Sequence, residues 1–234
     1  MRIAFQKAKW ARAVALGLVL FAACGARDKT PATQAEGNDS PQVVFEGPRV
    51  LFLGDSLSAG LHLPANEAFP AVLAQLLAAE GHPIELVNAG VSGDTTAGGL
   101  ARLDWLLRQD PDLFVLELGA NDGLRGVSLE SIESNLRAIV RRVQDRWIPL
   151  LLLGLRLPPN YGQTYTTGFA DLFARIAADT EVTYVPFFLE SVAAHPAFNL
   201  PDGLHPNTEG HQRIGEDLLP VLRELVEQAE QAKR

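Results

Sequence analysis

The stretch "VLFLGDSLSAG" brings a run of apolar residues directly to Gly54, Asp55 and Ser56. A serine hydroxyl is a weak nucleophile at neutral pH, so it needs a base to take its proton and hydrogen-bond donors for the oxyanion that forms on attack. Further along, "PDGLHPN" contains Asp202 and His205, while "NAGVSGDT" and "GANDGLRG" supply backbone-exposing glycines and a side-chain amide. Together, these residue types have the parts that nucleophilic acyl transfer requires.

Each of these polar stretches follows an apolar segment of strand length. Five such segments recur, separated by stretches long enough for helices: "RVLFLG" (49–54), "IELVNAG" (84–90), "LFVLELG" (113–119), "IPLLLLG" (148–154) and "VTYVPF" (182–187). Nearly continuous apolar runs are typical of strands that are buried on both faces of a parallel sheet. In such sheets ligands bind beyond the carboxyl ends of the strands, which is where the polar stretches fall.

Apolar residues at helical spacing lie between these segments. The repeats run from Phe69 to Leu77, from Ile132 to Val143 and through Leu172 and Ile176. A last helix is predicted over "EGHQRIGEDLLPVLRELVEQ", with a kink or a break at Pro220. The alternation of strands and helices in a chain of 234 residues predicts one domain, a three-layer α/β/α sandwich with a five-stranded parallel sheet.

Five blocks of the sequence resemble a known family. "GDSLSAG", "NAGVSGDTTAGGLARL", "LELGANDGLRG", "LRLPPNYG" and "DGLHPN" are similar, in this order, to the conserved blocks of the SGNH (GDSL-type) hydrolases, which have a flavodoxin-like fold. Within that family the chain most resembles the bacterial thioesterase I, lysophospholipase and arylesterase branch. The resemblance runs from Arg49 to the C-terminal helix. The Gly-x-Ser-x-Gly motif of the α/β-hydrolases is absent, because residue 58 is a serine.

The resemblance implies a role for each residue that matches the motifs. Ser56 matches the nucleophile, His205 the base and Asp202 the acid that orients it. Gly93, through its backbone N–H, and Asn121, through its side-chain amide, match the donors to the oxyanion. The backbone N–H of Ser56 is expected to be a third donor. Two residues separate Asp202 from His205, so a single turn can bring the carboxylate to Nδ1 and leave Nε2 facing Ser56.

The reaction that the resemblance implies is hydrolysis of a carboxylic ester or thioester through an acyl-enzyme, without a metal or cofactor. The branch accepts acyl thioesters, lysophospholipids and aryl or short-chain esters. Apolar loop residues are expected to line an acyl groove, namely Leu124, Leu157, Pro158, Pro159 and Tyr161. Two alternatives stay open: a carbohydrate O-acetyl esterase that acts on cell-wall or extracellular glycans, and a non-catalytic lipid-tethered protein that binds acyl chains.

Other polar residues have simpler interpretations. Taken alone, Ser56 would be interpreted as a helix N-cap rather than as a nucleophile. Asp55 and Asp122 are expected to fix hydrogen bonds in their loops. Arg125 could meet a substrate head group or could be a solvated surface residue. The remaining histidines lack a metal-ligand spacing and are expected to be surface or packed residues: His62, His82, His195 and His211.

The N-terminal segment resembles an export signal. Residues 1–23 contain four basic residues, no acidic ones and a short apolar run, which predicts a signal peptide, and "LFAAC" resembles a lipoprotein box with Cys24 as the lipidated residue. The polar residues 24–48 are predicted to be a flexible tether, and residues 49–234 the hydrolase domain. An exported, periplasmic protein with a lipid anchor is therefore expected.

Charge and cysteine content exclude several kinds of partner and site. The chain has 28 acidic and 20 basic residues, and four of the basic ones lie in residues 1–23. The remaining 16 basic against 28 acidic residues give a charge of −12, which disfavours nucleic acid as a partner. Cys24 is the only cysteine, so the fold uses neither a disulfide nor a cysteine-ligated metal.

Overall fold

The computed structural model describes residues 47–233, which contain one five-stranded parallel sheet. The strands are β1 (Arg49–Gly54), β2 (Glu85–Asn88), β3 (Leu113–Glu117), β4 (Leu150–Leu153) and β5 (Thr183–Val185). Their order in the sheet is β2-β1-β3-β4-β5, and every neighbouring pair is parallel. The predicted fold class is therefore confirmed. All strands except β1 are shorter than the predicted segments, because residues at the ends of those segments belong to the adjoining loops.

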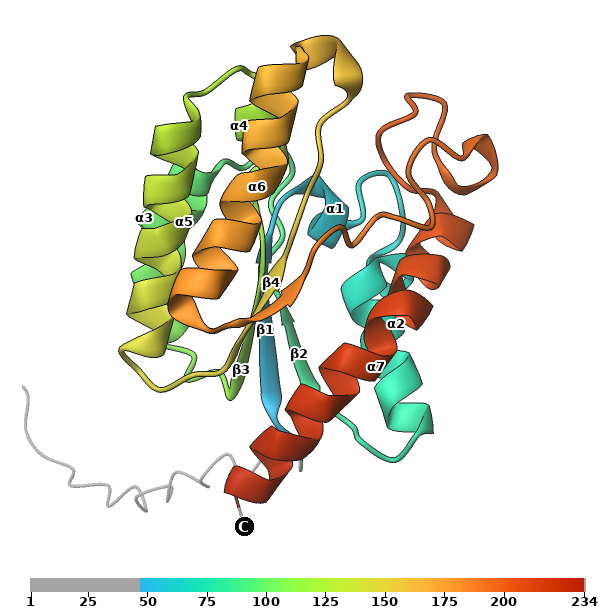
Figure 1. Cartoon of the computed structure of the whole chain (residues 1–234). Helices are drawn as coiled ribbons and strands as arrows, with labels where there is room; N and C mark the ends of the chain where they lie inside the picture. Colours follow the sequence, from blue (N-terminus) through green and yellow to red (C-terminus); the bar gives the residue numbers. More distant parts are fainter. Residues whose placement is uncertain (1–46, 234) are drawn as a thin grey trace, which may run out of the picture. The chain divides into compact units, whose positions relative to one another are not determined.

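Helices cover both faces of this sheet. The longer helices are α2 (Phe69–Ala79), α3 (Thr96–Leu107), α5 (Leu129–Gln144), α6 (Gln163–Thr180) and α7 (Thr208–Ala232). Figure 1 shows α3, α5 and α6 on one face and α2 and α7 on the other. The central strands β1, β3 and β4 are almost completely buried between these two layers. This is the three-layer sandwich that the sequence predicts.

The closing helix α7 continues through Pro220, so the predicted break does not occur. A proline inside a helix leaves the carbonyl four residues earlier without its usual donor. Here that carbonyl belongs to Glu216, and both Glu216 and Pro220 are exposed. Water can therefore take the place of the missing donor, while the opposite side of α7 stays packed on the domain.

The carboxyl ends of the strands meet a group of short elements and loops. Helix α1 (Ser56–Ala59) follows β1 and α4 (Ala120–Leu124) follows β3, and long loops follow β4 and β5 at the same edge. Among the described residues, no helix is both long and apolar enough to span a bilayer. The predicted signal segment, Cys24 and residues 24–46 of the predicted tether lie outside the described residues.

Candidate active site

Ser56 is the first residue of α1, directly after the end of β1. Asp55 is the N-cap of this helix, and its Oδ1 accepts a hydrogen bond from the Leu57 N–H at 3.0 Å. The cap is therefore Asp55, which leaves the Ser56 hydroxyl available for another partner. Ser56 is 8% exposed, so its hydroxyl lies at the boundary between the core and the cavity described below.

Asp202 and His205 meet within a single turn, as their spacing predicts. The Oδ1 atom of Asp202 accepts hydrogen bonds from the backbone N–H groups of Leu204 (2.9 Å) and His205 (3.0 Å), and its Oδ2 lies 2.7 Å from Nδ1 of His205. Gly203 has φ +68°, a conformation that glycine adopts without strain. The backbone N–H of His205, together with that of Leu204, lowers the pKa of Asp202 to about 2. Asp202 is therefore ionised at neutral pH.

The turn places the imidazole of His205 against Ser56. Nε2 of His205 lies 2.9 Å from Oγ of Ser56, although the two residues are 149 positions apart in the chain. Because the ionised Asp202 accepts a hydrogen bond from the Nδ1–H, the neutral imidazole keeps Nε2 free to accept a hydrogen bond from the serine hydroxyl. Ser56, His205 and Asp202 thus form one continuous line of hydrogen bonds.

The three N–H groups that are expected to face the oxyanion come from the segments that follow three different strands. Asn121 is in α4, and its Nδ2 donates to Oδ2 of Asp55 at 3.0 Å, which leaves the second hydrogen of its amide unused by Asp55. Within residues 47–233, the backbone N–H groups of Ser56 and Gly93 donate to no protein acceptor. Gly93 has φ +82° and sits in the loop after β2. The sequence analysis expects these three N–H groups to be the donors to the oxyanion.

A second carboxyl group, Glu117, lies beneath the turn that carries Ser56. It is fully buried, and its Oε2 accepts hydrogen bonds from the Asp55 N–H (3.2 Å), the Ser58 hydroxyl (2.8 Å) and the Ser58 N–H (3.3 Å). Its Oε1 has no partner among the described residues. The sequence analysis missed Glu117. The sequence contains one signal that could have identified Glu117: it is an acid inside the apolar run "LFVLELG", where a buried charge is unfavourable.

Burial raises the pKa of both neighbouring carboxyl groups. The pKa of Glu117 is raised well above its ordinary value by burial and by the charge of Asp55. Burial also raises the pKa of Asp55, but hydrogen bonds from Leu57 and Asn121 oppose this effect. Of the two carboxyl groups, Glu117 is therefore the one whose surroundings favour the protonated form more strongly, whereas the pKa of Asp55 is raised only to about 6.

A cavity of about 470 Å³ opens beside Ser56 and His205. Its walls are mostly apolar, and they include Leu124, Leu157, Pro158 and Pro159, as predicted. Tyr161 does not line it. Its hydroxyl instead donates to the backbone carbonyl of Leu124 at 3.2 Å, so this side chain holds a wall residue in place.

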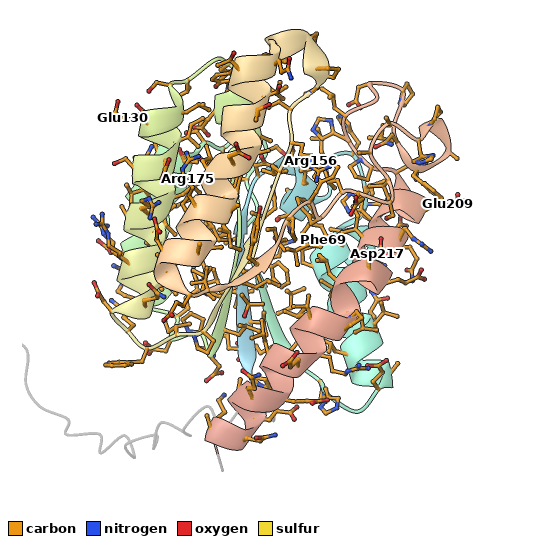
Figure 2. The ribbon with its side chains drawn as sticks, viewed as in Figure 1. Phe69, Glu130, Arg156, Arg175, Glu209 and Asp217 are labelled. Atoms are coloured by element: carbon orange, nitrogen blue, oxygen red, sulfur yellow. The ribbon has the colours of Figure 1, made fainter. Side chains whose placement is uncertain are left out.

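The cavity also has walls that the sequence analysis did not identify. Phe187, Leu189 and Val192 come from the loop after β5. Arg156 lies in the loop after β4, with its guanidinium 4.9 Å from the centre of the Phe187 ring. Figure 2 labels Arg156 among the loops beyond the sheet. The cavity therefore combines an apolar interior with one cation in its wall.

The other polar residues of the loops hold backbone segments. Asp122 accepts hydrogen bonds from the N–H and the hydroxyl of Thr96, both at 2.8 Å, and so fixes the start of α3. Arg102 binds Asp94 (2.8 Å) and the carbonyls of Ala89 (2.6 Å) and Gly54 (3.2 Å). In residues 47–233, no group of three or more His, Cys, Asp or Glu side chains could hold a metal ion.

Comparisons with known proteins show the family to which this chain belongs. Residues 52–213 match the GDSL-like Lipase/Acylhydrolase family. The chain is 42% identical over 179 residues to an arylesterase of Vibrio mimicus, and the matched region covers 76% of this chain and 88% of that protein. It is 40% identical over 178 residues to thioesterase 1/protease 1/lysophospholipase L1 of Escherichia coli strain K12 (76% of this chain and 84% of that protein). The crystal structure of TesA matches with a TM-score of 0.73 and 42% identity, covering 76% of this chain and 99% of that chain.

Proposed function

Because this chain belongs to the GDSL-like lipase/acylhydrolase family, it is a carboxylic ester hydrolase, and we propose that Ser56 is its nucleophile. In this proposal His205 is the general base and Asp202 orients it. Asn121, Gly93 and the backbone N–H of Ser56 stabilise the oxyanion. The observation that carries the proposal is the line of contacts at 2.9 Å from Ser56 to His205 and 2.7 Å from His205 to Asp202.

The reaction proceeds in two halves. In the first half, Oγ of Ser56 attacks the carbonyl carbon while Nε2 of His205 takes the hydroxyl proton, and the carbonyl oxygen becomes an oxyanion. The tetrahedral intermediate then collapses, the bond to the leaving group breaks, and His205 gives its proton to that group. In the second half, water attacks the acyl-enzyme, again with His205 as base, and the acid is released from Ser56. A donor aimed at the oxyanion contributes about 3–4 kcal/mol to lowering the barrier.

The cavity supports an apolar acyl group as the substrate class. Its walls are mostly leucine, proline, alanine, valine and phenylalanine side chains, next to Ser56 and His205. We propose that the enzyme hydrolyses acyl esters and thioesters of the kinds named for its relatives, the arylesterase and the thioesterase 1/lysophospholipase L1. An acyl chain would lie along Leu124 and Leu157, with its carbonyl at Ser56.

A substrate panel tests this class. We expect p-nitrophenyl butyrate and octanoate to be hydrolysed with a higher kcat/KM than the acetate, because each buried methylene contributes about 0.8 kcal/mol. Acetylated xylan is expected to be a poor substrate. Preference for acetyl groups on xylan over both longer esters would contradict the proposed class and favour a carbohydrate O-acetyl esterase.

The nucleophile is tested by the substitution Ser56→Ala. We expect this variant to lose turnover of p-nitrophenyl butyrate while it keeps the circular dichroism spectrum and melting temperature of the parent. Ser131→Ala is a matched control, since Ser131 is exposed on α5, and it should keep the parent's activity. Hydrolysis by Ser56→Ala at the parent's rate would refute the assignment. A folded, inactive variant that still binds fatty acid would support it over a purely carrier role for the parent.

We also propose that the protein is exported and carries a lipid at Cys24. The support is the sequence alone, namely the basic and apolar residues 1–23 followed by "LFAAC". Mass spectrometry of the mature N-terminus tests this. A diacylglyceryl mass on Cys24 is expected, and its loss in the variant Cys24→Ala should release the protein from the membrane fraction. A mature chain that begins elsewhere and lacks lipid would contradict the proposal.

A further inference from the structure

The side-chain amide of Asn121 is held at both ends by groups of opposite charge. Its Nδ2 donates to Oδ2 of Asp55 at 3.0 Å, and its Oδ1 lies 3.4 Å from Nη2 of Arg125. The same Nη2 atom donates to the backbone carbonyl of Gly93 at 3.2 Å. We propose that Arg125 is a positioning residue of the oxyanion hole, which it serves by fixing both Asn121 and Gly93. This inference rests on the proposed function.

The charges select one orientation of the amide. If the amide were rotated by half a turn, its oxygen would face the carboxylate of Asp55 and its NH₂ group would face the guanidinium of Arg125. Both contacts would then be repulsive. In the observed orientation both are attractive, and one N–H of Asn121 is left to point at the oxyanion. Arg125 thus acts on the donor without touching the substrate.

Arg125 also joins two loops that must keep a fixed separation. Asn121 belongs to α4, after β3, whereas Gly93 lies in the loop after β2. The backbone of Arg125 is itself fixed at the end of α4, because its N–H donates to the carbonyls of Asn121 and Asp122, each at 3.2 Å. From this anchored position the guanidinium reaches across to Gly93. Two of the three proposed donors are therefore tied to each other by one side chain.

The position of Arg125 favours this role over a structural one. Arg125 is exposed, and no carboxylate of the described residues lies within 4.0 Å of it. Removal of its guanidinium therefore breaks no ion pair and opens no cavity in the core. A contact with a substrate head group is the competing explanation. The two explanations predict different kinetics. If Arg125 contacted a substrate head group, its removal would raise KM, and the effect would be the same with or without Asn121.

A double-mutant cycle separates these explanations. We expect Arg125→Gln to lower kcat for p-nitrophenyl butyrate about tenfold with KM within about twofold, which is about 1.4 kcal/mol in the barrier. In the background of Asn121→Ala the same change should cost less than about threefold, because only the Gly93 donor is then left for Arg125 to position. Arg108→Gln is the matched control, because Arg108 is the C-cap residue of α3 and its described side-chain contact is the carbonyl of Asp104 in that helix. This control should leave kcat and KM unchanged.

Inactivation by a p-nitrophenyl alkylphosphonate gives a second readout, since its phosphoryl oxygen would occupy the oxyanion site. The rate constant should fall about tenfold in Arg125→Gln and stay at the parent's value in Arg108→Gln. The inference is overturned by an equal loss of kcat in both backgrounds, by a change in KM alone, or by no loss. An active Ser56→Ala variant would instead overturn the proposed function, so the two failures are distinguishable.

Discussion

Replacing His211 by asparagine removes a titrating group from the contact between α7 and α2. His211 is 1% exposed, and its Nδ1 accepts a hydrogen bond from the N–H of Phe69 at 3.1 Å. Phe69 begins α2, and the preceding Ala68 offers no side-chain cap, so the imidazole satisfies a helix N–H that would otherwise lack a partner. A protonated imidazole carries a hydrogen on Nδ1 and cannot accept this bond. Folding therefore requires the neutral form.

The size of the effect follows from the pKa of this histidine. Burial, together with the charge of the nearby His205, lowers the pKa of His211 from its ordinary value of 6.5 to about 4. Between these two values the unfolded chain binds a proton that the folded chain does not. Stability from His211 is therefore fully present above about pH 6.5 and is lost as the pH falls toward about 4. At about 1.4 kcal/mol per pKa unit, the loss is about 3 kcal/mol.

Urea unfolding at about pH 7.5 and about pH 4.5 measures this loss in the parent and in His211→Asn. Asparagine keeps an acceptor near the position of Nδ1 but does not titrate. It also leaves some space beside Phe69, so the variant should be less stable at both pH values. The decisive quantity is the change in the free energy of unfolding between the two pH values, because the carboxyl groups titrate alike in the parent and the variant and their contribution cancels. We expect this change to be larger in the parent by about 2–3 kcal/mol. An equal change in both proteins would refute the argument.

Three further predictions concern the site. Asn121→Ala should lower kcat for p-nitrophenyl butyrate about 10²–10³-fold with little change in KM, and a change in KM alone would argue against an oxyanion role. Gly54→Ala should lower the free energy of unfolding by at least about 2 kcal/mol in urea titrations, because a Cβ there would lie 2.1 Å from Oγ of Ser58 and 2.6 Å from Oε2 of Glu117; parent-like stability would contradict this packing. His205→Ala should lower kcat for p-nitrophenyl butyrate about 10²–10⁴-fold, since the Ser56 hydroxyl then has no base to take its proton, and a parent-like kcat would count against the base.

Local patterns were sufficient to predict most of the fold. The continuous apolar run of β1 matches the observed strand from Arg49 to Gly54, because this strand is central and buried on both faces. The start of α2 at Phe69 likewise coincides with the start of its apolar repeat. No comparable repeat was identified for α3, whose first turns contain Gly98 and Gly99. A Cβ at Gly99 would lie 2.3 Å from Leu118, so the approach of α3 to the sheet explains this residue.

The parts of the site that depend on pairing between distant segments could not be predicted in this way. The turn with Asp202 and His205 is local, so the spacing of these two residues in the sequence was sufficient to predict their contact. Glu117 meets the turn after β1 only because β3 lies beside β1 in a register that sets Glu117 opposite Gly54. The bond from Phe69 to His211 joins residues 142 positions apart, and no spacing rule relates them.

The proposed base and the acid proposed to orient it lie in one four-residue turn, which makes their mutual contact independent of the contact between the base and Ser56. Asp202 and His205 keep their mutual contact wherever their loop rests, because backbone N–H groups of the same turn hold the carboxylate. Only the 2.9 Å contact with Ser56 reports whether the loop is seated on the domain. If the loop that carries Asp202 and His205 moved away from Ser56, the enzyme would lose activity while the imidazole–carboxylate pair stayed intact. The low-field proton resonance of that pair would then persist in an inactive molecule.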